Sequence, residues 1–124
     1  MDVENAPPSI SVVLCTYNGE TFIEAQLQSI LNQTLPPTEI IVSDDGSTDS
    51  TLERVEGIAH ASPKEIRWDI RTRAAPLGAA ENFGSALPLA TGDFIALSDQ
   101  DDVWVADKLE VMSQQLSENP SLLL

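Results

Sequence analysis

Apolar residues along the chain follow two alternating patterns, and each pattern predicts a different type of element. Residues 10–16 are almost wholly apolar and rich in β-branched side chains, which is typical of a strand covered on both faces. Residues 39–43 and 94–97 show the same pattern in shorter runs. In residues 66–71 apolar and charged side chains alternate, which predicts a half-exposed strand near a sheet edge.

Helical patterns follow each of these four strands. Residues 21–32 carry apolar side chains at the spacing of a helical stripe. Ser47 or Thr48 is positioned to cap a second helix, and residues 79–89 and 107–116 repeat the helical spacing. Strict alternation of strands and helices predicts an α/β fold with three layers, α/β/α, around a mainly parallel sheet.

Length and charge limit the classes of protein to consider. The chain has 124 residues, the size of one domain, and we expect residues 1–9 to be a flexible lead and residues 10–124 to be that domain. A formal net charge of -14 argues against nucleic acid as a partner. The first residues show no secretory signal, so we expect a cytoplasmic protein, with the full-length protein peripheral at the cytoplasmic face of the membrane. The single cysteine, Cys15, is expected to be a small buried apolar residue.

Polar clusters follow three of the four predicted strands. They occupy residues 16–20, 44–49 and 98–102. In parallel sheets wound by crossover helices, ligands bind outside the carboxyl ends of the strands. The sequence therefore predicts that all three clusters lie on one rim of the sheet, with at least four carboxylates among them.

Each cluster has one interpretation as a binding site and one as ordinary structure. Asp99 and Asp101 can reach one hard cation, such as Mg²⁺ or Mn²⁺, or they can form a solvated acidic turn that starts a helix. Asp45 can accept a hydrogen bond from a base N–H, or belong to a loop that caps a helix. Tyr17 offers a flat face for stacking a base, or is a rim tyrosine before a helix.

Several ordered motifs together resemble those of family 2 glycosyltransferases with the GT-A fold. The chain would then be the N-terminal, nucleotide-sugar-binding half of that fold, and the last motif is most similar to the rhamnosyltransferase-like members. The match runs from about Ile10 to Leu116. Its motifs are Val12-Val13-Leu14-Cys15-Thr16-Tyr17-Asn18, Ser29-Ile30-Leu31-Asn32-Gln33-Thr34, Ile41-Val42-Ser43-Asp44-Asp45-Gly46-Ser47-Thr48-Asp49, residues 78–89, Gly92-Asp93-Phe94-Ile95 and Leu97-Ser98-Asp99-Gln100-Asp101-Asp102.

The resemblance implies a donor, a cation and a set of binding residues. The donor would be a nucleoside diphosphate sugar of the UDP, dTDP or GDP type, and the acceptor a glycan or lipid-linked hydroxyl. Asp99 would lie near the ribose or the cation, and Asp101 would bind the Mg²⁺ or Mn²⁺ that bridges the diphosphate. The remaining donor-binding residues would be Thr16, Tyr17, Asn18, Asp44, Asp45 and Asn82.

Two features depart from the family pattern. Glu81 stands where many members carry an arginine before Asn82, so Arg71 or Arg73 would have to supply the contact to phosphate. No residue is assigned as the catalytic base of the inverting transfer, and we expect that base and the acceptor-binding half beyond Leu124. A sheet cut at four strands would expose an edge, so we also expect self-association.

Three other classes of protein share parts of this pattern. A receiver-type signalling module would be phosphorylated on Asp44 or Asp45, but it needs a lysine after a late strand, and Lys64 and Lys108 lie elsewhere. A non-catalytic acidic α/β interaction domain would bind neither nucleotide nor phosphate. A sugar-nucleotide nucleotidyltransferase would carry a glycine-rich loop after the first strand, where this chain has only Gly19.

Overall fold

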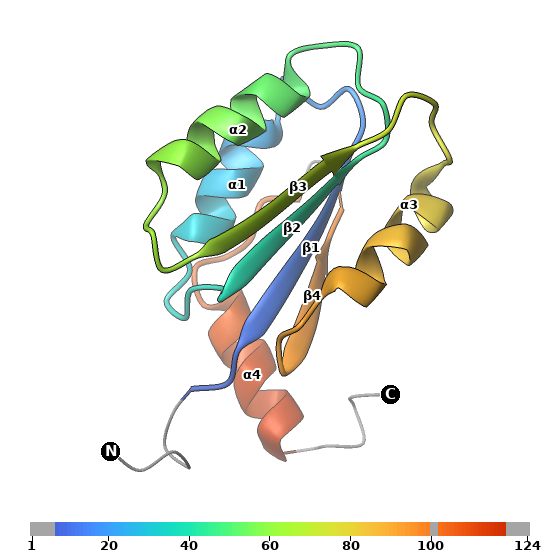
Figure 1. The fold of residues 1–124 in the computed structure, drawn as a ribbon. Coiled ribbons are helices and arrows are strands. Elements are labelled where there is room, and N and C mark those ends of the chain that lie inside the picture. The colour runs from blue at the N-terminus through green and yellow to red at the C-terminus, as the bar shows by residue number, and fades with distance from the viewer. Residues whose placement is uncertain (1–6, 100–101, 119–124) are drawn as a thin grey trace.

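The computed structural model describes residues 7–99 and 102–118, and these form a single four-stranded parallel sheet with helices on both faces (Figure 1). The strand order is β3-β2-β1-β4, and the strands are β1 (Ile10–Thr16), β2 (Glu39–Asp44), β3 (Arg67–Thr72) and β4 (Phe94–Ser98). The sheet has no antiparallel pair among these strands. Within the described residues, no helix is both long and apolar enough to cross a membrane.

The helices divide unequally between the two faces of the sheet. They are α1 (Ile23–Leu31), α2 (Thr51–Ala61), α3 (Ala79–Ala86) and α4 (Lys108–Glu118). The larger apolar core joins Val12 and Leu14 of β1 to Leu27, Val55 and Leu109 of α1, α2 and α4. The smaller core contains Val13, Ile41 and Ala86, and so places α3 on the opposite face. The predicted three-layer α/β/α fold is therefore confirmed.

The burial of each strand follows its position in the sheet. Every residue of β1 and β2 is buried, as expected for strands covered by helices on both faces. Among the strands of the described residues, β3 pairs only with β2, and its residues are half-buried or exposed, so the predicted edge position is confirmed. β4 forms the other edge and alternates between buried and exposed residues.

Two local predictions were wrong. Neither Ser47 nor Thr48 caps α2; the side chain of Asp49 instead accepts a hydrogen bond from the backbone N–H of Thr51, at 2.9 Å. The helix predicted over residues 79–89 ends at Ala86 and continues as the 3₁₀ turn η2 (Leu87–Leu89). Pro88 explains this early end, because proline lacks the N–H that the next helical turn requires.

Candidate functional site

A cavity of about 300 Å³ opens at the carboxyl ends of the strands. Residues from all three predicted clusters line it, together with the start of α3. The predicted convergence on one rim is therefore confirmed for those cluster residues that reach the cavity. The lining residues are Cys15, Thr16, Tyr17, Asp45, Pro76, Gly78, Ala79, Asn82 and Asp99.

The carboxylate of Asp45 is buried where it lines this cavity. Its Oδ1 accepts hydrogen bonds from the backbone N–H of Leu77 at 2.8 Å and from Arg73 Nη1 at 3.0 Å, and its Oδ2 accepts one from the N–H of Gly78 at 2.9 Å. Burial by itself would raise the pKa of Asp45, but these donors and the charge of Arg73 outweigh it and hold the pKa below its usual value. Asp45 is therefore an anion at neutral pH and acts only as a hydrogen-bond acceptor.

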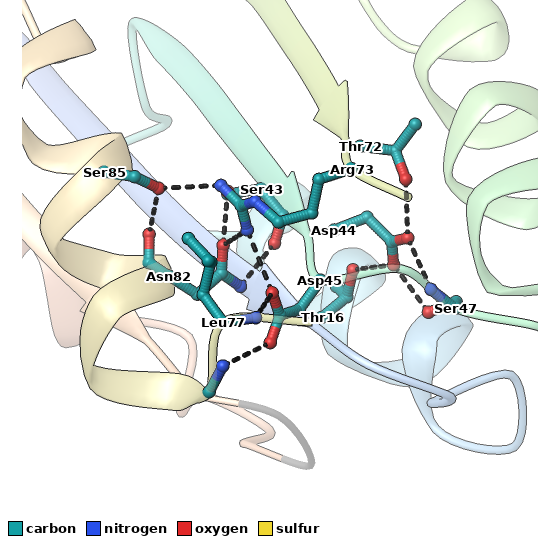
Figure 2. Close-up of polar contacts among 11 residues, drawn as sticks. Thr16, Ser43, Asp44, Asp45, Ser47, Thr72, Arg73, Leu77, Asn82 and Ser85 are labelled. Carbon is teal, nitrogen blue, oxygen red and sulfur yellow. Dashed lines mark hydrogen bonds and ion pairs between the residues drawn. The ribbon is translucent and has the colours of Figure 1, made fainter. Parts of the chain in front are cut away.

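Asp44 points to the opposite side of β2 from Asp45 (Figure 2). Its Oδ1 accepts from Thr16 Oγ1 at 2.7 Å and Ser47 Oγ at 2.6 Å, and its Oδ2 accepts from the Ser47 N–H at 2.9 Å and Thr72 Oγ1 at 3.1 Å. Four donors fill the acceptor positions of one carboxylate. Asp44 does not line the cavity, and its bonds join the ends of β1, β2 and β3. Its contact with a base stays a prediction.

Asn18 likewise connects two loops instead of lining the cavity. Its backbone N–H donates to Ser47 Oγ at 2.8 Å, and its side-chain Oδ1 accepts from the N–H of Thr48, also at 2.8 Å. Its φ of 48° lies in the left-handed region, which asparagine tolerates better than most residues. Asn18 is not among the residues that line the cavity, and its donor-binding role stays a prediction. Tyr17, its neighbour, does line the cavity and is 45% exposed.

Asn82 lines the cavity, and Arg73 bonds it without lining the cavity itself. Arg73 Nη1 donates to Asn82 Oδ1 at 2.6 Å as well as to Asp45, and Arg73 Nη2 donates to Ser85 Oγ at 2.9 Å (Figure 2). Asn82 Nδ2 donates to the backbone carbonyl of Ser43 at 2.9 Å, which places α3 against the end of β2. The predicted position of Asn82 at the site is supported by this geometry.

From the sequence, Arg73 is predicted only as one of two alternatives, with Arg71, for a contact with the donor phosphate. Its guanidinium is committed to Asp45, Asn82 and Ser85. Arg71 is further from such a role, since its side chain is exposed on β3 and paired with Asp69 at 3.0 Å. The same rule about strand ends, applied to β3, would have found Arg73, because it follows the last residue of that strand.

Asp99 begins a tight turn at the end of β4. Its N–H donates to Asp102 Oδ2 at 3.1 Å, and the N–H of Asp102 donates to the Asp99 carbonyl at 3.2 Å. Asp99 lines the cavity at the end of β4, and β1 lies between β4 and β2, the strand that Asp45 follows. The other predicted metal ligand, Asp101, lies outside the described residues. Within the described part of the chain no group of three or more metal-binding side chains gathers. Mg²⁺ and Mn²⁺ often bind through one or two carboxylates and substrate phosphates, so this donor set fits such a cation when a phosphate ligand is present.

Cys15 lies in the floor of the cavity and is 6% exposed. Burial, with a smaller effect from the negative charge of Asp99, raises the pKa of its thiol to about 12. A thiol that stays protonated is a poor nucleophile. The prediction of a buried apolar role for Cys15 is confirmed.

Comparisons with known proteins agree with this arrangement. Residues 11–123 match the model of the family described as "Glycosyl transferase family 2". The chain is 36% identical over 115 residues to an Escherichia coli UDP-Glc:alpha-D-GlcNAc-diphosphoundecaprenol beta-1,3-glucosyltransferase, covering 92% of this chain and 44% of that protein. It is 40% identical over 101 residues to the dTDP-rhamnosyl transferase RfbG of Shigella flexneri, covering 78% and 34%.

A solved structure shows the same fold. The mannosyltransferase PcManGT of Pyrobaculum calidifontis, in complex with GDP-Man and Mn²⁺, superimposes with a TM-score of 0.83 at 28% identity. The match covers 93% of this chain and 34% of that one. The chain thus spans less than half the length of each of these relatives.

Proposed function

The chain belongs to glycosyltransferase family 2, and we propose that its cavity binds the nucleoside diphosphate of a sugar donor. The observation that carries this proposal is the meeting of Tyr17, Asp45, Asn82 and Asp99 in one cavity at the strand ends. The tyrosine ring offers a stacking surface, and the anionic Asp45 offers an acceptor for a base N–H. Asp99 lines the same cavity, where the diphosphate of such a ligand would lie.

A divalent cation, Mg²⁺ or Mn²⁺, completes this proposal. The net charge of -14 and the carboxylate of Asp99 would repel a diphosphate unless a cation lay between them. Asp99 would bind that cation, with Asp101 as the second ligand expected from the sequence. The cation supplies Lewis-acid stabilisation of the leaving nucleoside diphosphate. The relative with GDP-Man and Mn²⁺ supports this part of the proposal.

The transfer itself would invert the anomeric carbon and deliver the sugar to a hydroxyl of a glycan or a lipid-linked acceptor. Cell-surface polysaccharide synthesis is the process we propose, because one relative is named for a diphosphoundecaprenol acceptor. The described residues at the cavity include no group assigned as the base that would activate this hydroxyl. The acceptor site and the base are therefore proposed to lie in the part of a longer protein that this chain does not span.

Titration calorimetry with UDP, dTDP and GDP, each with and without Mn²⁺, tests the proposal. We expect at least one of these ligands to bind, and to bind about tenfold or more tightly with the cation. Asp99→Asn should remove most of that gain, whereas replacement of Asp107, an exposed aspartate that does not line the cavity, by asparagine should keep it. A folded protein that binds none of the three ligands would refute the assignment.

The edge at β4 supports a second proposal, that this chain associates with itself. Among the described strands β4 pairs only with β1. Its side chains Ile95 and Leu97 lie on the same face of the sheet as Val13 and α3, and they are 42% and 49% exposed. An unpaired strand edge beside exposed apolar residues favours pairing with another strand. Light scattering at rising concentration should show dimers; a strict monomer at high concentration would contradict this.

A further inference from the structure

Two residues of α1 hold the chain on either side of the acidic turn, which begins at Asp99 and ends at Asp102. The side-chain amide of Gln26 donates to the backbone carbonyl of Asp99. The hydroxyl of Ser29 accepts from the backbone N–H of Trp104 at 3.0 Å and donates to the backbone carbonyl of Gln26 at 2.7 Å. A single turn of α1 therefore bonds the chain both where the acidic turn begins and just after it ends.

The helix fixes how far apart these two points of attachment lie. Gln26 and Ser29 are three residues apart, which is a rise of about 5 Å along the axis of an α-helix. The five residues from Asp99 to Trp104 would span about 17 Å if the chain were extended. The attached chain is therefore much longer than the gap it bridges, and it must fold back on itself. The hydrogen bonds between Asp99 and Asp102 close that fold.

Packing alone does not explain why residue 26 is a glutamine. Gln26 is 1% exposed, and its Oε1 has no hydrogen-bond partner among the described residues. A buried polar atom without a partner costs free energy, and an apolar side chain would avoid that cost. What an apolar side chain could not supply is the amide N–H that bonds the end of β4 and the acidic turn.

We infer that α1 sets the shape of the acidic turn and that Gln26 and Ser29 are positioning residues for the cation, an inference that rests on the proposed function. Asp99 lines the cavity, whereas neither Gln26 nor Ser29 does, so both act through the backbone of the turn. Mg²⁺ demands nearly ideal octahedral geometry from its ligands. A turn of altered width would keep its carboxylates but would present them less well to the cation.

The pair of variants Ser29→Thr and Ser29→Val tests this inference. Threonine and valine have similar shapes, and only threonine keeps the hydroxyl that accepts from Trp104. Both introduce a β-branched side chain into α1, so any effect of branching on the helix is shared by the two variants. Ser29→Ala, which favours the helix and also lacks the hydroxyl, should behave as Ser29→Val does.

Titration calorimetry measures the effect on the cation. It uses whichever of UDP, dTDP and GDP binds the unchanged protein most tightly, with and without Mn²⁺. We expect Ser29→Thr to keep the gain in nucleotide affinity that Mn²⁺ brings. Ser29→Val should reduce that gain by about threefold or more, the equivalent of one hydrogen bond.

Hydrogen exchange, followed by NMR in the protein without ligand or cation, measures the effect on the turn itself. The amide of Asp102 donates to the Asp99 carbonyl and so reports whether the turn is closed. It should exchange faster in Ser29→Val than in Ser29→Thr. The amide of Phe94, which donates to the Ser9 carbonyl at the other end of β4, is the control and should exchange equally in both.

The outcomes separate this inference from the function on which it rests. If both variants show the same Mn²⁺ gain and the same exchange at Asp102, α1 does not shape the turn, while cation-assisted nucleotide binding stands. If exchange at Asp102 is faster but the Mn²⁺ gain is unchanged, Ser29 only stabilises the fold and its positioning role is wrong. If the unchanged protein is folded but binds no nucleotide, the proposed function fails and the positioning role fails with it.

Discussion

Gln26 of α1 donates a hydrogen bond from its side-chain amide to the backbone carbonyl of Asp99, which lies 73 residues further along the chain. The same amide donates to Ser98 Oγ at 3.1 Å. Ser29 accepts from the N–H of Trp104 at 3.0 Å, and Gln33 bonds the carbonyl of Val105 at 2.7 Å. These three side chains are spaced three and four residues apart, as on one face of a helix, and they bond the backbone on both sides of the acidic turn.

Replacement of Gln26 by leucine should displace this turn. The Asp99 carbonyl would lose one of its two donors and Ser98 Oγ would lose its bond to the amide, which predicts a destabilisation of about 1–3 kcal/mol and a weaker Mn²⁺ effect on nucleotide binding. Urea denaturation and calorimetry with Mn²⁺ measure the two effects. Gln28→Leu, an exposed position on the same helix, is the control. Equal Mn²⁺ affinities in the two variants would show that Gln26 does not position the turn.

Glu39 predicts how stability depends on acid. It is 3% exposed, and burial by itself would raise its pKa. Hydrogen bonds from Ser11, Thr91 and Arg67 outweigh this effect and lower the pKa from 4.5 to about 2. The unfolded chain binds the proton more readily, so this stabilisation is complete above pH 4.5 and is lost as the pH falls towards 2. The loss is about 3 kcal/mol by linkage.

Denaturation curves between neutral and acidic pH measure this effect. Glu39→Gln should be less stable at neutral pH and should show a flatter acid limb than the unchanged protein. Glu56→Gln, an exposed glutamate on α2, should keep the full acid dependence. An unaltered acid limb in Glu39→Gln would contradict the assignment.

Cys15 should resist alkylation while the protein is folded. Its pKa of about 12 leaves almost no thiolate at pH 8, and its side chain is buried. Mass spectrometry after iodoacetamide treatment should find the thiol unmodified in the native protein and modified in concentrated guanidinium chloride. Rapid labelling of the native protein would mean that the cavity floor opens.

Two glycine-to-alanine substitutions should have opposite effects. Gly46 has a φ of 85°, and a Cβ there would lie 3.0 Å from the Arg73 carbonyl, so Gly46→Ala should destabilise the fold by about 1–3 kcal/mol. Gly57 lies in α2, and outside the backbone of that helix no atom would lie within 4 Å of an added Cβ, so Gly57→Ala should stabilise the fold by up to about 1 kcal/mol. Thermal denaturation compares the two, and a stabilising Gly46→Ala would disprove the assigned strain.

The sequence by itself determined the order of the elements and the rim at which the site forms. Apolar runs such as residues 10–16 can only be buried between helices, and the alternation of strands and helices forces a parallel sheet. Parallel strands end on one side, so Tyr17, Asp45 and Asp99 had to meet there. The cap of α2 was mispredicted because Asp49 competes for the same helix end as Ser47 and Thr48.

Only the tertiary structure decided which polar residues face a ligand. Asp44 and Asp45 are adjacent and identical in type, but consecutive residues of a strand point to opposite faces of the sheet. One of those faces carries the closely packed bonds to Thr16, Ser47 and Thr72, and the other carries α3 and the cavity. Asp45 lines the cavity and is held there by donors from distant segments, Arg73 and Gly78. The local sequence around residues 44 and 45 does not specify these contacts, because they depend on how the chain folds.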